Sequence, residues 1–190
     1  MENLTVVIVT FKTPEKIILD CLRSISPKVK VLIVENSENF TLKDKILSQF
    51  SNVELLCAGK NLGYGCANNY GMSFVKTDYV LILNPDVILD KATINEIIIA
   101  SKKIESFAIL SPLSIDNKYP NYKIRVSKNH SIKIHEPFKV KSVDGFAMLI
   151  DKKKVAKLKD NKNPNLFDEN FFMYLENDDL CKRVIDKNEN

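Results

Sequence analysis

The feature that most constrains this chain is a regular alternation in its first 110 residues, where short β-branched apolar runs alternate with longer amphipathic stretches. The runs predict strands buried on both faces, and the amphipathic stretches predict helices. The expected strands are Leu4–Val9, Val29–Val34, Val53–Cys57, Tyr79–Leu83 and Phe107–Leu110. The expected helices are Thr13–Ser24, Thr41–Phe50, Tyr64–Val75 and Lys91–Ile104. Such an alternation predicts an α/β fold with a mostly parallel central sheet flanked by helices.

The periodic pattern ends near Pro112. Residues 112–141 are rich in Pro, Asn, Lys and Tyr without a lasting period, which predicts a long surface excursion with at most a short edge strand. Beyond it we expect an apolar strand at Val143–Ile150, a short helix at Lys152–Leu158, and an acidic, aromatic segment at Phe167–Ile185 that becomes helical near Leu175.

The composition predicts one domain in the cytoplasm. The chain has 190 residues, of which 45% are hydrophobic, which is enough for one core. Its apolar runs are too short to span a bilayer, and no basic leader follows Met1. The four cysteines lack metal-ligand spacing and are expected to be reduced thiols. A net charge of +4 is too small to predict a nucleic-acid partner.

Polar side chains follow each of the first four strands. In open parallel sheets ligands bind beyond the carboxyl ends of the strands, although ordinary turns use the same residue types. The candidates are Thr10 and Phe11 after the first strand, Glu35 after the second, Asn61 after the third, and Asn84 and Asp86 after the fourth.

Four of the five glycines lie within thirteen residues, at positions 59, 63, 65 and 71. Glycine at a strand-to-helix turn lets the backbone approach a ligand and presents N–H groups at a helix start, which suits a phosphate or a ribose. The spacing matches neither a P-loop nor a dinucleotide fingerprint. A tight turn without a ligand is the alternative.

Two acidic positions carry candidate chemistry. Asp86 follows a buried strand in the tripeptide Asn84-Pro85-Asp86, whose proline restricts the backbone of the turn. Its carboxylate could hold a divalent cation against a diphosphate. The alternative is that the tripeptide is only an Asx-type turn. Glu176 and Asp179 share one border of the last predicted helix with Arg183. Either carboxylate could act as a general base or bind an acceptor sugar, and acids also favour a first helical turn for electrostatic reasons.

Taken in order, six segments resemble glycosyltransferase family 2, the inverting enzymes with the GT-A fold. The resemblance is strongest to the rhamnosyltransferase-like branch that builds bacterial surface polysaccharides. The segments are VVIVTF at 6–11, VLIVENS at 31–37, NLGYGCANNYG at 61–71, NPD at 84–86, VDGFAMLI at 143–150 and FDENFFMYLENDDLCKR at 167–183. NPD corresponds to the DXD motif of the family.

The resemblance implies one GT-A domain over residues 1–190, with a nucleotide-sugar-binding half at 1–110 and an acceptor-side and catalytic segment at 111–190. It implies a hexosyltransferase-type enzyme that moves a sugar such as rhamnose from a UDP- or dTDP-sugar to a glycan or lipid-linked acceptor. Mn²⁺ or Mg²⁺ would bind at Asp86, and Glu176 or Asp179 would be the base. Thr10, Phe11, Glu35, Asn61, Gly63, Asn68 and Asn84 would hold the nucleotide-sugar, with Asp144 and Gly145 on its sugar side.

Three departures from the family pattern leave an alternative open. Glu35 stands where the family has a base-contacting Asp, and Asn177 interrupts its Glu-Asp pair. The family also continues beyond the last helix, often with a metal-binding His that His130 and His135 are placed wrongly to replace. We therefore expect an excised core or a short homologue, and a catalytically silent sugar-nucleotide-binding partner subunit is the alternative function.

A nucleotidyltransferase is a third function, and it is disfavoured. The Lys-rich stretches of the chain predict peripheral contact with the inner face of the membrane.

Overall fold

The computed structural model describes residues 3–116, 118, 120–124, 136–158 and 165–187. The strands are β1 (Leu4–Thr10), β2 (Lys30–Glu35), β3 (Val53–Cys57), β4 (Tyr79–Leu83), β5 (Ile109–Leu110), β6 (Tyr122–Lys123), β7 (Ser142–Val143) and β8 (Ala147–Asp151). The helices are α1 (Glu15–Ser24), α2 (Lys43–Gln49), α3 (Tyr64–Phe74), α4 (Thr93–Lys103), α5 (Lys152–Ala156) and α6 (Glu176–Asp186). The expected α/β pattern is confirmed.

Six strands form the central sheet in the order β3-β2-β1-β4-β8-β5. The first four in this order are parallel, and β8 runs antiparallel to both of its neighbours. The expected fifth strand, β5, is shorter than its apolar run. It lies at the edge of the sheet because the fully apolar Ala147–Ile150 stretch, which is buried on both faces, takes the place beside β4. The sheet is therefore mostly parallel, as expected, with β8 in its interior.

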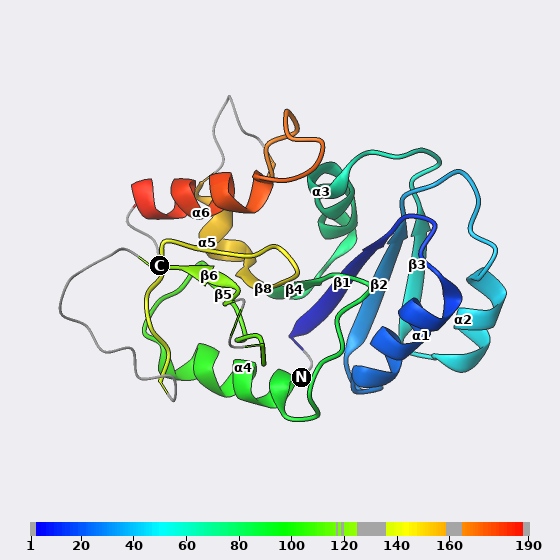
Figure 1. Cartoon of the computed structure of the whole chain (residues 1–190), viewed down its shortest axis with the longest axis horizontal. Coiled ribbons are helices and arrows are strands. Elements are labelled where there is room, and N and C mark those ends of the chain that lie inside the picture. Colours follow the sequence, from blue (N-terminus) through cyan, green and yellow to red (C-terminus); the bar gives the residue numbers. More distant parts are fainter. Residues whose placement is uncertain (1–2, 117, 119, 125–135, 159–164, 188–190) are drawn as a thin grey trace.

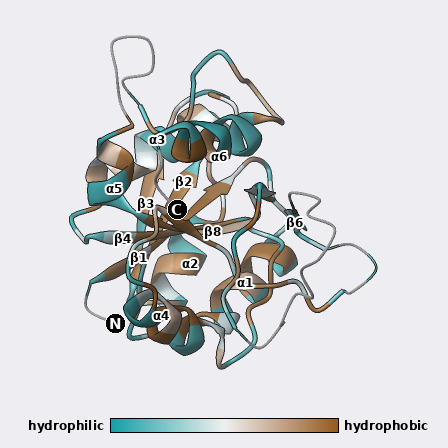
Figure 2. Cartoon of the chain, turned by 90° about the vertical axis from the view of Figure 1, so that its left-hand side faces the viewer, coloured by the Kyte–Doolittle hydropathy of each residue, from teal (hydrophilic) through white to brown (hydrophobic). Residues whose placement is uncertain are grey.

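Successive side chains of a strand point to opposite faces of the sheet, so they pack into two hydrophobic cores, one on each face. Val6 and Ile8 of β1 pack with buried residues of α1, α2 and α4. Val7, between them, packs instead with α3, α5 and α6. Figure 1 shows the two sets of helices on opposite sides of the sheet, and Figure 2 shows the strands as a hydrophobic layer between helices with hydrophilic outer faces.

This topology gathers distant segments at one edge of the sheet. Thr10 pairs with Glu35 at the carboxyl ends of β1 and β2, and Leu83 ends β4 beside Ala147. Because β8 is antiparallel, the turn that precedes it lies at this same edge. The excursion contributes β6, which pairs with β7 in a separate two-stranded sheet and so confirms the short strand expected there. Within the described ranges, no helix is both long and apolar enough to cross a membrane.

Candidate functional site

The carboxylate of Glu35 braces the ends of β1 and β2. Glu35 is only 1% exposed, and its Oε2 accepts a hydrogen bond from the Thr10 hydroxyl at 2.7 Å. Its Oε1 accepts a hydrogen bond from the Ser37 hydroxyl at 2.5 Å. Sequence reasoning assigned Glu35 to the nucleotide, but the structure places its carboxylate beneath the surface. Phe11, the next residue after Thr10, is exposed, and the Lys12 ammonium lies over its ring, 5.4 Å from the centroid.

Asn36 shapes the glycine-containing loop. Its side-chain amide donates to Asn61 Oδ1 at 2.9 Å and to Gly63 O at 3.3 Å, while its Oδ1 accepts from the Leu62 N–H at 2.9 Å. Asn36 is buried, so these bonds fix the loop from below. Asn36 lies in the VLIVENS segment but is not one of the predicted site residues. Its signal was its place directly after a buried strand.

The closest approach at Gly63 is to the chain itself. Gly63 has φ +81°, and a Cβ there would lie 2.3 Å from the carbonyl oxygen of Phe172. The same oxygen accepts a hydrogen bond from the Tyr64 N–H at 3.0 Å. The segment before α6 therefore fills the space on the Cβ side of Gly63, and the contact of this loop with a nucleotide stays a prediction. Gly59, with φ +72°, has no atom within 4 Å of such a Cβ.

Asn68 lies in the interior. It is fully buried on α3, its amide group donates to Tyr64 O at 3.0 Å, and its Oδ1 has no hydrogen-bond partner in the described structure. A buried acceptor without a donor costs free energy, which makes this oxygen a candidate for a bound water or a ligand hydroxyl.

Asp86 is the open carboxylate of the site. It lies within a turn in which the Val87 N–H donates to Asn84 O at 3.2 Å, and no hydrogen bond or ion pair joins the Asp86 side chain to another described residue. The backbone therefore makes this turn without the Asp86 carboxylate. Asn84 carries a buried Oδ1 that also lacks a partner in the described structure.

The donor set at Asp86 fits a hard divalent cation. Mg²⁺ and Mn²⁺ take oxygen ligands, and one protein carboxylate is enough when substrate phosphates supply the others. Among the described residues, no three His, Cys, Asp or Glu side chains group closely enough to hold a metal ion. An ion at Asp86 would therefore have to be shared with a bound ligand. His130 and His135 lie outside the described residues.

Glu176 begins α6, as expected, and its side chain is enclosed. It is 5% exposed, and its Oε2 has no hydrogen-bond partner in the described structure. Burial raises the pKa of the Glu176 carboxyl, and the negative charge of Asp178 raises it further. The two preceding residues, Tyr174 and Leu175, both have φ +69°, a conformation that costs free energy in non-glycine residues. A strained backbone thus leads directly into a carboxylate suited to accept a proton.

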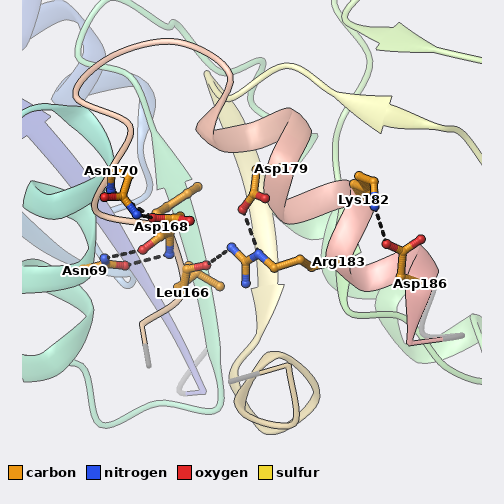
Figure 3. A network of polar contacts seen from close by, with 9 residues as sticks. Asn69, Leu166, Asp168, Asn170, Asp179, Lys182, Arg183 and Asp186 are labelled. Atoms are coloured by element: carbon orange, nitrogen blue, oxygen red, sulfur yellow. Dashed lines mark hydrogen bonds and ion pairs between the residues drawn. The ribbon is translucent and has the colours of Figure 1, made fainter. Parts of the chain in front are cut away.

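Asp179 is already partnered. Its Oδ2 accepts a hydrogen bond from Arg183 Nε at 2.7 Å, and the guanidinium also donates to Leu166 O at 2.6 Å (Figure 3). Asn69 of α3 joins the same segment through two 2.9 Å hydrogen bonds with the backbone of Phe167 (Figure 3). Sequence reasoning placed Asp179 and Arg183 on one helix border correctly, and the structure uses the pair to anchor α6.

The turn before β8 joins the site through its backbone. Gly145 O accepts a hydrogen bond from the Tyr64 hydroxyl at 2.5 Å, and Val143 O accepts one from the Asn177 amide at 2.8 Å. Asp144 is exposed at this turn. The structure thus brings Asp144 and Gly145 to the edge that carries Glu35 and Asp86.

The family model of Glycosyl transferase family 2 matches residues 5–162. This chain belongs to that family. The predicted resemblance to this family is therefore confirmed, and the match includes the first five of the six segments.

Two curated relatives match most of the chain. The low-salt glycan biosynthesis hexosyltransferase Agl10 of Haloferax volcanii is 24% identical over 206 residues, which cover 100% of this chain and 64% of that protein. The rhamnosyltransferase WbbL of Escherichia coli is 24% identical over 198 residues, which cover 89% of this chain and 71% of that protein. The chain therefore spans about two thirds of the length of these relatives.

Solved structures show the same fold. Staphylococcus aureus TarS 1–349 superposes with a TM-score of 0.66 at 15% identity, covering 96% of this chain and 55% of that one. The mannosyltransferase PcManGT of Pyrobaculum calidifontis, solved with GDP-Man and Mn²⁺, superposes with a TM-score of 0.60 at 13% identity, covering 82% of this chain and 46% of that one. These likenesses confirm a GT-A type fold.

Proposed function

We propose that this chain is the catalytic core of an inverting glycosyltransferase that takes a sugar from a nucleotide-sugar donor. One observation carries the proposal. Asp86 is exposed and makes no hydrogen bond to another described residue, whereas Glu176 is enclosed and its Oε2 has no partner in the described structure. Both lie close enough to Tyr64 that their negative charges raise the pKa of its hydroxyl. Two carboxylates in contrasting environments suit two roles, cation binding and proton acceptance.

The donor is proposed to be a UDP- or dTDP-sugar, with rhamnose as the transferred sugar. Support comes from the relatives named as a rhamnosyltransferase and a dTDP-rhamnosyl transferase, and from a structural neighbour solved with UDP. Phe11 and the loop with Asn61 and Gly63 would contact the base and ribose, with Thr10, Glu35, Asn68 and Asn84 supporting them from below. Asp144 and Gly145 would border the sugar. Asp86 would hold Mn²⁺ or Mg²⁺, which supplies positive charge against a diphosphate.

Glu176 is proposed as the general base. The acceptor hydroxyl would give its proton to the carboxylate of Glu176 while its oxygen bonds to the anomeric carbon. The bond from that carbon to the diphosphate would break on the opposite face, so the nucleoside diphosphate leaves with the bonding electrons and the configuration inverts. A raised pKa makes Glu176 a stronger base than an exposed glutamate. Asn177 has no basic group, and Asp179 is held by Arg183.

The acceptor is proposed to be a glycan or a lipid-linked sugar of a cell-surface polysaccharide, with transfer at the inner face of the cytoplasmic membrane. The relatives named for glycan synthesis and rhamnosyl transfer support this assignment. Co-sedimentation with anionic vesicles at low salt tests the membrane contact. A protein that stays entirely in the supernatant would contradict it.

Calorimetric titration tests the donor site. UDP and dTDP are each titrated into the wild-type protein and into Asp86→Ala, with and without Mn²⁺. We expect metal-dependent binding to the wild type and the loss of that metal dependence in Asp86→Ala. Binding that ignores both the metal and the substitution would remove Asp86 from the site. Absence of binding by either nucleotide would contradict the proposed function.

A catalytically silent partner subunit is the second candidate, and Asn177 favours it. The Asn177 amide is engaged with Val143 O, so this side chain has become part of the framework. A panel of UDP- and dTDP-sugars, assayed for release of the nucleoside diphosphate, separates the two functions. Nucleotide binding without turnover of any sugar-nucleotide would favour the silent subunit.

A further inference from the structure

Tyr64 lies where the two halves of the site meet. It is the first residue of α3, directly after Gly63, and its N–H donates to Phe172 O at 3.0 Å. Its ring packs edge-on against Phe167, with the centroids 6.2 Å apart. Its hydroxyl donates to Gly145 O at 2.5 Å. One residue therefore contacts the loop before α3, the segment before α6 and the turn before β8.

The Tyr64 hydroxyl is a permanent hydrogen-bond donor. Burial raises its pKa well above the ordinary range, and the negative charges of Glu176 and Asp86 raise it further. The hydroxyl therefore keeps its single proton at every physiological pH, and Gly145 O accepts it.

Gly145 extends this contact to α6. A Cβ at Gly145 would lie 3.6 Å from the Tyr64 hydroxyl oxygen and 3.6 Å from Asn177 Cβ, so the two side chains enclose the glycine backbone. Asn177 also donates to Val143 O at 2.8 Å. A continuous series of contacts thus runs from the loop at Gly63, through Tyr64 and Gly145, to the residue next to Glu176.

We infer that Tyr64 is a positioning residue whose hydroxyl couples occupancy of the nucleotide loop to the order of the 144–147 turn and of the first turn of α6. This inference rests on the proposed function, because the ligand it invokes is the donor nucleotide. A nucleotide held at Asn61 and Gly63 restrains the start of α3, and the hydroxyl passes that restraint to the turn that packs against Asn177, the residue after Glu176.

Amide hydrogen exchange measures this coupling. Wild type, Tyr64→Phe and Tyr70→Phe are compared without ligand and with saturating UDP or dTDP plus Mn²⁺. The matched control removes, from the same helix, a hydroxyl that makes no hydrogen bond within the described residues. Without nucleotide, we expect residues 144–147 to exchange about tenfold faster in Tyr64→Phe than in the other two proteins. With nucleotide, residues 176–181 should gain protection in wild type and Tyr70→Phe only, while the Kd of Tyr64→Phe stays within about threefold of wild type.

Each outcome decides between named alternatives. Equal protection of α6 in wild type and Tyr64→Phe, with nucleotide bound to both, would overturn the coupling and leave the proposed function intact. Failure of the wild type to bind either nucleotide would overturn both. Should Tyr64→Phe not fold, as judged by circular dichroism, Asn177→Ala replaces it by breaking the path at its α6 end. That variant should lose the protection of α6 and keep that of residues 144–147, and wild-type protection of α6 would overturn the coupling.

Discussion

Substituting alanine at Gly63 tests the packing of the segment before α6 on the nucleotide loop. The backbone of Gly63, at φ +81° and ψ 172°, is in a region that only glycine adopts readily, and an alanine there costs about 1–3 kcal/mol. The added Cβ would also lie 2.3 Å from Phe172 O, which forces the two segments apart. Separation would break the bond from the Tyr64 N–H, worth about 0.5–1.5 kcal/mol. We expect a total loss of about 3 kcal/mol in the free energy of unfolding.

Gly59→Ala is the matched control, because Gly59 also has a positive φ but open space around it. Its cost should be the conformational part alone, about 1–2 kcal/mol. In a domain of this size the melting temperature falls by about 2–4 °C per kcal/mol, which predicts falls of about 9 °C for Gly63→Ala and about 4 °C for Gly59→Ala. Urea unfolding followed by circular dichroism gives both free energies. Equal losses in the two variants would show that Phe172 does not pack on Gly63.

The remaining predictions concern α6. Asn177→Asp restores the acid that the family has at this position. Because a carboxylate cannot donate to Val143 O, we expect this variant to lower the melting temperature by about 3–6 °C. An unchanged or higher melting temperature would contradict this prediction. Glu176→Gln should lower turnover of the identified sugar-nucleotide by about 10²–10⁴-fold. Asp179→Asn only weakens the ion pair with Arg183, so it should lower turnover by less than about threefold. The reverse order of the two effects would make Asp179 the base. Because the folded state keeps the Glu176 proton to a higher pH than the unfolded state does, the free energy of unfolding should fall as the pH rises above the ordinary value of 4.5 through the folded-state pKa. Glu176→Gln should lack this pH-dependent part of the free energy of unfolding. Urea unfolding of the wild type and of Glu176→Gln measures it, and parallel pH profiles of the two proteins would refute the prediction.

The elements of the fold could be predicted because each depends on a local pattern. Continuous β-branched runs such as Val6–Val9 indicate strands wherever they occur, and the amphipathic stretches between them indicate helices. The position of β8 could not be predicted in this way. An apolar run shows that a strand is buried and does not show which neighbour it pairs with.

The candidate site was predictable in its membership and less so in its geometry. The strand ends show which polar residues share an edge, so Glu35 and Asp86 could be selected from the sequence. That Glu35 turns inward to two hydroxyls, and that Phe172 fills the space beside Gly63, depends on contacts between segments far apart in the chain. No local pattern contains that information.

The interior place of β8 has a consequence for how the chain acquires its structure. Leu83 of β4 pairs with Ala147 of β8, which is synthesised more than sixty residues later. Until then, one side of β4 has N–H and C=O groups without a partner strand. Pairing across such a separation closes a long loop and folds slowly. A fragment that stops at residue 110 would expose that apolar strand and is expected to aggregate. Strands from before and after residue 110 therefore share one sheet, and we expect them to unfold together.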